Sequence, residues 1–258
     1  MYMLDPSQIE ADAKQEGLSR EDLVVPEAVV LTFSGVVRSD FAESYGMKIW
    51  RWPGWKFSPY STPSQAFKGS ASGVNTAVVI PPMGASPLIA MCEELSHFGA
   101  QTILLLCASW SLGPDRLAKG EIQLPTFAVG LDGTSPHYGN SGFRVKSQKR
   151  VDQALSSALD ESRAEWKTGG VGSCEAIYRI SQEMVDDYVK MGCLSMENGE
   201  TAALFSLAKV KDLNVGILLQ PYLDLTQGWA ISYMDDAYKT ACHSQAEAAM
   251  LALKTLHS

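Results

Sequence analysis

Two acidic residues stand where a carboxylate could do chemistry. Glu200 opens the small-residue run ETAALFSLAKV, and Asp224 ends the apolar stretch GILLQPYLD. Glu200 could accept hydrogen bonds from the hydroxyl groups of a ligand, or it could be a first-turn glutamate that the helix dipole favours. A carboxyl group at the end of a buried strand can act as a general acid, because partial burial raises its pKa. Asp224 could equally be a turn or N-cap residue.

A third segment, Met83–Ser86, lies between an apolar run and a helical pattern. Gly84 would let the backbone approach a ligand closely, and the helix N–H groups that follow suit an oxygen-rich or anionic ligand. A plain tight turn is the alternative. His137, in the stretch GTSPHYG, is the histidine nearest to this predicted pocket. The five cysteines are widely spaced, with no CxxC and no zinc spacing, so we expect reduced thiols and no metal site.

The elements that must position these residues follow a repeating β and α order. Apolar runs predict strands at Pro26–Val37, Asn75–Ile80, Thr102–Ala108, Glu121–Val129 and Asn214–Gln220. Helical spacing predicts helices over Leu88–Ala100, Val151–Trp166, Thr201–Val210 and Ser244–Leu256, with Ser86 as the N-cap of the first and Pro87 at its first position. The tryptophan-rich segment Ile49–Tyr60 suggests a hairpin or lid, or simple packing on the domain or a partner subunit. The order predicts a mixed α/β fold with helices on both faces of a sheet, in which ligands bind at the carboxyl ends of strands.

Length and composition narrow the class of protein. The 258 residues are 46% hydrophobic and 19% charged, and no linker divides them, which predicts one domain over residues 1–258 with a polar arm at 1–23. The net charge is −8 and the basic residues are scattered, so we expect no nucleic-acid partner. Apolar runs such as Ile103–Ala108 are far shorter than the ~20 residues that cross a bilayer. With an acidic, polar start, this predicts a cytoplasmic protein with no membrane contact.

Several of these segments, in the same order, resemble the nucleoside phosphorylase and nucleosidase superfamily from about Gln65 onward. The similar stretches are AFKGSASGVNTAVVIPPMGASPLIAMCEEL, LGPDRLAKGEIQLPTFAVGLDGTSPHYG, SMENGETAALFSLAK and NVGILLQPYLD. The resemblance implies a single-domain, three-layer α/β/α fold with a central, mixed, partly barrel-like β-sheet. It also implies cleavage of the N-glycosidic bond of nucleosides.

The resemblance assigns roles to particular residues. The ribose-binding glutamate of the family corresponds to Glu200, and the methionine that precedes it there is Gly199 here, so that Met196 and Glu197 just upstream are candidate substitutes. The aspartate that protonates or hydrogen-bonds a departing purine corresponds to Asp224. The stretch VGSCEAIYRI is similar to the base-side segment, which nominates Tyr178 for packing near the base.

The phosphate side departs from the family pattern. The Gly-Asp-Pro-x-Arg turn is replaced by TFSGVVR, which ends at Arg38, and the strand that should carry an arginine and a hydroxyl clamp reads LLCASW. Leu105 and Ala108 stand where the clamp is expected, and Ser109 and Trp110 follow them. A phosphate dianion without its arginines loses charge-assisted hydrogen bonds of about 1.5–3 kcal/mol each. We expect Gly84, Ser109 and Trp110 to line the substrate pocket.

Three functions remain open from the sequence. The first is hydrolytic cleavage of a purine-type nucleoside or related N-riboside, with Glu200 holding the ribose, Asp224 as the general acid and no cofactor. The second is phosphorolysis with phosphate as co-substrate, its anion held by Ser86 and by Arg51 or Lys56. The third is a non-catalytic member that binds a small molecule, which Trp110 and the tryptophan-rich segment favour. The resemblance also implies a homo-oligomer, a dimer or a hexamer.

Overall fold

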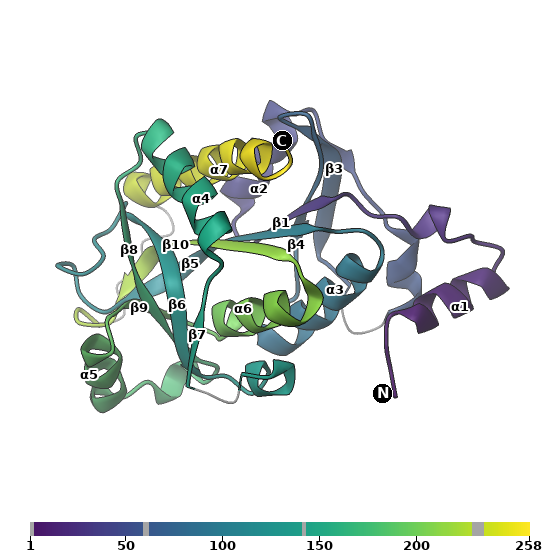
Figure 1. The fold of residues 1–258 in the computed structure, drawn as a ribbon. Coiled ribbons are helices and arrows are strands. Elements are labelled where there is room, and N and C mark those ends of the chain that lie inside the picture. Colours follow the sequence, from purple (N-terminus) through teal and green to yellow (C-terminus); the bar gives the residue numbers. More distant parts are fainter. Residues whose placement is uncertain (1–2, 59–61, 141–142, 229–234) are drawn as a thin grey trace.

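The computed structural model describes residues 3–58, 62–140, 143–228 and 235–258, and within them ten strands form one mixed sheet covered by helices on both faces (Figure 1). The strands are β1 (Ala28–Thr32), β2 (Lys48–Ile49), β3 (Gln65–Ala71), β4 (Val74–Ile80), β5 (Thr102–Ser111), β6 (Ile122–Leu131), β7 (Arg144–Lys146), β8 (Trp166–Cys174), β9 (Cys193–Glu197) and β10 (Asn214–Asp224). The helices are α1 (Ser7–Gln15), α2 (Gly35–Ser44), α3 (Ala85–His97), α4 (Lys149–Glu161), α5 (Gln182–Lys190), α6 (Glu200–Lys211) and α7 (Asp236–Leu256). Short 3-10 turns, η1 to η4, span Glu21–Leu23, Pro53–Phe57, Ser135–Tyr138 and Ile177–Arg179.

The sheet is partly closed on itself. Its strand order is β10-β6-β8-β9-β5-β1-β4-β3-β2, with β7 on β6, and β10 also pairs with β5. This second pairing joins β5, β9, β8, β6 and β10 into a ring, while β1 to β4 continue as an open sheet. The predicted three-layer α/β/α fold with a partly barrel-like mixed sheet is confirmed.

Alternation of apolar residues along the central strands builds the layers, because successive side chains of a strand point to opposite faces. Leu31 and Leu105 pack with α3 and α6, whereas Val30 and Leu104 pack with α2, α4 and α7. A third apolar cluster beneath α5 contains Trp110, Met196 and Tyr188. The carboxyl ends of β4 and β9 lead into α3 and α6, whose N-termini meet.

Several predicted boundaries are wrong. The helix predicted over Val151–Trp166 ends at Glu161, and Trp166 begins β8. Local capping explains two other differences. The strand expected over Pro26–Val37 ends at Thr32, because Ser34 caps α2 by accepting a hydrogen bond from the Val37 N–H at 3.4 Å. The expected N-cap Ser86 lies inside α3, whose N-cap is Gly84 at φ 105°. Only glycine adopts that backbone conformation readily, so the helix starts two residues earlier than predicted.

The tryptophan-rich segment packs on its own domain. Trp50 and Trp52 are buried, and the ring centroids of Trp52 and Phe98 lie 5.2 Å apart. The indole N–H of Trp52 donates a 2.7 Å hydrogen bond to the Leu23 carbonyl. Within its described part, Ile49–Ser58, the segment contains β2 and η2, while residues 59 and 60 of the expected hairpin or lid lie outside the described residues.

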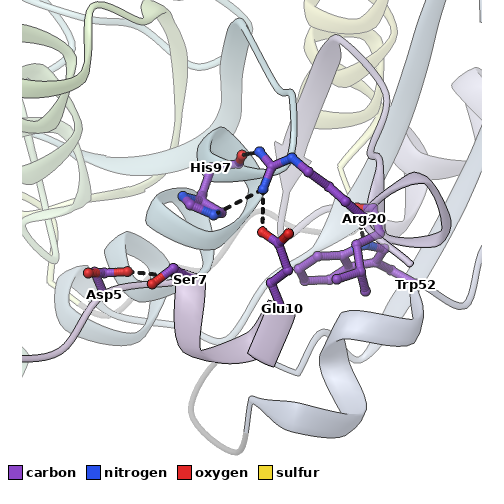
Figure 2. A network of polar contacts seen from close by, with 7 residues as sticks. Asp5, Ser7, Glu10, Arg20, Trp52 and His97 are labelled. Carbon is purple, nitrogen blue, oxygen red and sulfur yellow. Dashed lines mark hydrogen bonds and ion pairs between the residues drawn. The ribbon is translucent and has the colours of Figure 1, made fainter. Parts of the chain in front are cut away.

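The N-terminal arm is held against the body by a polar network (Figure 2). Arg20 donates hydrogen bonds to Glu10 Oε2 at 2.5 Å and to the carbonyl of His97, the last residue of α3, at 3.1 Å. Ile9 and Ala13 of α1 are buried in the same core cluster as α3. Contacts of α1 and Arg20 thus dock the polar arm on α3.

Candidate active site

The N-termini of α3 and α6 meet at the two site residues that the sequence placed there. Glu200, the first residue of α6, is 2% exposed, and its Oε1 accepts a hydrogen bond from the Gly84 N–H at 3.1 Å. Because the N-terminal N–H groups of a helix favour negative charge, both helices stabilise this carboxylate. The structure therefore brings Gly84 and Glu200 together.

Glu197 ends β9 and lies beside Glu200. Its Oε1 accepts hydrogen bonds from the Gly199 N–H at 2.9 Å and from Ser173 Oγ at 3.2 Å. Burial raises the pKa of the Glu197 carboxyl well above its ordinary value, and Glu200 raises it further, against the opposing effect of the backbone N–H groups. The Glu200 side chain lies within hydrogen-bonding reach of the Glu197 carboxyl.

Gly199 links β9 to α6 in a conformation that excludes the methionine of the family pattern. Its φ is 102°, and a Cβ atom there would lie 2.8 Å from the Cβ of Asp132 and 3.5 Å from Cγ of Glu175. Both the backbone angle and the close contact require glycine. Met196 does not take the missing position, because it points into the cluster beneath α5.

Sequence reasoning missed two acidic residues that complete this site. The carboxylate of Asp132 accepts hydrogen bonds from the N–H and Oγ of Ser135, both at 2.6 Å, and so shapes the turn after β6. Glu175, which follows β8, accepts a hydrogen bond from the Gly133 N–H at 3.1 Å. The signal was present in the family-like stretch LDGTS and in VGSCE, but neither carboxylate stood out from the sequence alone.

A cavity of 450 Å³ opens beside Glu175. Ser86 and Ala90 of α3 line one side, and Gly133, His137 and Glu175 line the other. Its size is in the range of small-molecule sites. His137, on η3, is exposed and borders this cavity as well as a larger one, of 940 Å³, between α1 and α3. The larger cavity is lined by residues that include Ile9, Phe57 and Val210, and neither Gly84 nor Glu200 lines it.

Ser109 and Trp110 occupy opposite faces of β5. Trp110 is 3% exposed, pairs with Met196 across the sheet, and donates its indole N–H to Tyr222 Oη at 2.7 Å. Extending the same antiparallel register by one residue places Ser109 opposite Glu197. The Ser109 hydroxyl is buried and has no hydrogen-bond partner within the described residues. Ser109 thus lies on the side of the carboxylates, whereas Trp110 and Met196 belong to the apolar cluster.

The remaining sequence candidates lie outside the carboxylate cluster. Asp224 ends β10 and is half-buried, and its Oδ1 accepts hydrogen bonds from the Thr226 N–H at 2.8 Å and from Thr226 Oγ1 at 2.6 Å. This is the arrangement of a turn aspartate. Tyr178 lies on η4 with 85% of its surface exposed, so the structure does not bring it to the cluster.

At the expected anion side two residues are apolar and two cations have side-chain partners, although the buried Nε of Arg38 has no hydrogen-bond partner within the described residues. Leu105 is fully buried in the core, and Ala108 is half-buried. Arg38 donates hydrogen bonds to Gln65 Oε1 at 2.5 Å and to Ser39 Oγ at 2.8 Å, and its guanidinium lies 5.6 Å from the centre of the Phe67 ring. The Lys56 ammonium pairs with Glu16 of the arm. These contacts direct both cations toward protein groups.

The described ranges hold neither a candidate metal centre nor a candidate membrane helix. Within those ranges, no group of three or more His, Cys, Asp or Glu side chains is arranged so that it could hold a metal ion. Nor does any helix in that part of the chain have the length and apolar character needed to span a membrane.

Comparison with known proteins places the chain in a family. The model of the phosphorylase superfamily matches residues 29–254, and the chain belongs to that superfamily.

Two curated relatives are phosphorylases of different nucleosides. The chain is 28% identical over 149 residues to the guanosine phosphorylase of Halorubrum lacusprofundi, which covers 58% of this chain and 61% of that protein. It is also 28% identical over 138 residues to the uridine phosphorylase of Treponema pallidum, covering 49% of this chain and 53% of that one. The matched region thus spans little more than half the length of these relatives.

A solved structure shares the fold over nearly its whole length. The purine nucleoside phosphorylase of Toxoplasma gondii, crystallised in complex with immucillin-H, superposes with a TM-score of 0.77 at 18% identity, covering 93% of this chain and 94% of that one. At this identity the likeness concerns the fold alone.

Proposed function

We propose that the chain cleaves the N-glycosidic bond of a neutral nucleoside, with water as the acceptor of the sugar. The observation that carries the proposal is the buried Glu200 carboxylate, which accepts a hydrogen bond from Gly84 N–H at the N-terminus of α3, the helix whose Ser86 and Ala90 line a cavity of small-molecule size. Membership of the phosphorylase superfamily supports nucleoside chemistry.

Glu200 is the sugar-side group of this proposal. As the bond from the sugar to the base lengthens, positive charge develops on the sugar ring, and a fixed carboxylate stabilises it. The carboxylate also accepts hydrogen bonds from sugar hydroxyl groups. Its burial strengthens both effects, because water does not screen them.

Asp224 is the proposed proton donor on the base side. The water oxygen bonds to the anomeric carbon, and the electron pair of the broken carbon–nitrogen bond goes to the base. The base takes a proton from Asp224, and the proton released by water restores that carboxyl group. Because Oδ1 of Asp224 accepts the hydrogen bonds from Thr226, Oδ2 is the oxygen that would carry the proton.

The choice of water over phosphate rests on the anion side. Leu105 and Ala108 provide no charged or hydrogen-bonding side chain, and the guanidinium of Arg38 is engaged by Gln65 and Ser39. A phosphate dianion there would lose its hydration without gaining charge-assisted hydrogen bonds. Water needs no such clamp.

Phosphorolysis is the second candidate, because both curated relatives are named phosphorylases. One experiment separates the two. Release of the base from guanosine, inosine, adenosine and uridine is followed in phosphate-free buffer and again with added phosphate, and the sugar product is identified. We expect release without phosphate and free ribose as the product. Ribose 1-phosphate, or a strict need for phosphate, would establish phosphorolysis, whereas nucleoside binding without release under either condition would support a binding protein.

We further propose that the chain forms a homo-oligomer, a dimer or a hexamer, as the family resemblance implies. Light scattering coupled to size-exclusion chromatography measures the mass directly. A monomer at the concentrations used for the assay would contradict this proposal.

A further inference from the structure

Glu197 and Glu200 form a buried carboxyl pair. The residues are separated only by Asn198 and Gly199, and they are 4% and 2% exposed. Each carboxyl has its own backbone partner, Gly199 N–H for Glu197 and Gly84 N–H for Glu200. The two carboxyl groups lie within hydrogen-bonding reach of each other, and a hydrogen bond between them requires a proton on one of them.

The groups that face the pair are acids or neutral side chains. Asp132 from the turn after β6 and Glu175 from the end of β8 lie against Gly199, between the two glutamates. The thiol of Cys107 on β5 and the phenol of Tyr188 on α5 also lie within electrostatic reach of Glu197. Burial raises the pKa of both of these groups, so each stays uncharged at neutral pH. Two bare carboxylates buried here would repel each other, a large penalty in a low-dielectric interior.

We propose that Glu197 keeps its proton at neutral pH and donates it in a hydrogen bond to Glu200, so that the pair carries one negative charge. Glu197 is then a positioning residue: it fixes the orientation of the Glu200 carboxylate and confines the charge to that side chain. The role of Glu200 toward the sugar rests on the proposed function, but the shared proton does not.

The hydrogen bonds of Glu197 fit this role. Its Oε1 accepts the two shorter bonds, from Gly199 N–H at 2.9 Å and Ser173 Oγ at 3.2 Å. Its Oε2 accepts only from the Thr201 N–H, at 3.4 Å and shared with Oε1, and is therefore the oxygen that we expect to carry the proton. On the other side, Oε1 of Glu200 is fixed by Gly84 N–H. The series of hydrogen bonds from Ser173 through Glu197 and Glu200 to Gly84 thus connects β8, β9, α6 and α3 around one negative charge.

Three variants test the proposal. Glu197→Gln keeps the shape, and its amide can still donate to Glu200 and accept from Gly199 N–H. Glu197→Leu can do neither. Glu43→Gln, on the exposed side of α2, is the matched control for loss of a carboxyl group.

The first measurement is the melting temperature from about pH 5 to about pH 9. A carboxyl whose folded-state pKa lies above its ordinary value of 4.5 stabilises the fold below that pH and loses this contribution as the pH rises. We therefore expect the melting temperature of Glu197→Gln, measured relative to that of the wild type, to increase as the pH rises. We expect no such trend for Glu43→Gln. A difference that stays constant over the whole range would overturn the shared proton.

The second measurement is the pH profile of kcat and KM for base release. We expect Glu197→Gln to keep kcat/KM within about threefold at neutral pH and to lose the alkaline decline of the wild type, while Glu197→Leu loses about tenfold or more in kcat. A Glu197→Gln enzyme as inactive as Glu200→Gln at every pH would overturn the positioning role. If the wild type releases no base at all, the proposed function fails, but the melting series still decides the shared proton.

Discussion

The Gly84 N–H and the Glu200 carboxylate are hydrogen-bonded at 3.1 Å, although 116 positions separate them in the chain. Gly84 caps α3 after β4, and Glu200 opens α6 after β9. One contact therefore aligns two helix N-termini from distant segments on the same negative charge. The positive end of each helix dipole faces the carboxylate, an arrangement that favours negative charge at this place.

Glu200→Gln removes this charge while preserving the size of the side chain. Fixed electrostatic groups at reacting centres are worth about 10²–10³ in rate, so we expect kcat/KM for base release to fall by about that factor. The fold is expected to remain, because the amide oxygen still accepts from Gly84 N–H. Steady-state kinetics beside a circular-dichroism melt measure both effects. Retention of wild-type turnover by a folded Glu200→Gln protein would remove Glu200 from the reaction.

Gly199→Ala tests the joint between β9 and α6. The new methyl group would stand 2.8 Å from the Cβ of Asp132, on a residue with φ of 102°. Backbone strain and crowding together predict a loss of about 2–5 kcal/mol in the free energy of unfolding, measured by urea titration.

Gly73→Ala is the matched control for this substitution. Gly73 has φ of 85°, but no atom lies within 4 Å of the place that its new methyl group would take. Only backbone strain therefore applies, with an expected loss of about 1–2 kcal/mol. The difference between the two variants isolates the crowding against Asp132. Equal losses would show that the contact with Asp132 relaxes freely.

The main layers of the fold could be predicted because their strands and helices carry clear apolar patterns. The segment Thr102–Ala108 reads as a buried strand, and α6 reads as a helix of small apolar residues. The strand β8 could not be predicted, because its sequence WKTGGVGSC is rich in glycine, which is rare in strands. Its glycines serve close packing: a Cβ on Gly170 would lie 2.2 Å from the Phe127 ring, and one on Gly172 would lie 2.6 Å from the Tyr188 ring.

The site residues that stand at the start of a helical pattern could be predicted from the sequence. Gly84 and Glu200 each stand at the start of a helical pattern, and their meeting follows from the order of the strands. Glu197 and Met196 were both nominated, but β9 was not predicted, and alternation along that strand sends Met196 to the opposite face. Asp132 and Glu175 are brought to Gly199 by turns whose geometry the sequence does not specify.

Arg38→Met tests the anion side. The guanidinium donates to Gln65 and Ser39, so its loss is expected to lower the free energy of unfolding by about 0.5–1.5 kcal/mol. If water is the acceptor, the rate of base release should be unchanged and still independent of phosphate. Lys48→Met, which removes an exposed cation from β2, is the control. A phosphate-stimulated rate that disappears only in Arg38→Met would instead make Arg38 a phosphate ligand.

His97→Gln tests how the N-terminal arm is held. Burial lowers the pKa of His97, and the nearby Arg20 lowers it further. Because the folded state resists protonation of His97, the unfolded chain binds more protons below its ordinary pKa of 6.5, and stability falls as the pH drops through that value. A charged His97 would also repel Arg20, which anchors the arm through Glu10 and the His97 carbonyl (Figure 2).

The glutamine variant is neutral at every pH and keeps the backbone carbonyl that accepts from Arg20. We therefore expect it to lose less stability than the wild type between about pH 7 and about pH 5, and its arm to resist proteolysis better at the acidic end. Melting curves and timed protease digestion, with cleavage sites mapped by mass spectrometry, measure the two effects. Parallel losses of stability in both proteins, with equal rates of cleavage within residues 3–23, would show that the protonation of His97 does not control the docking of the arm.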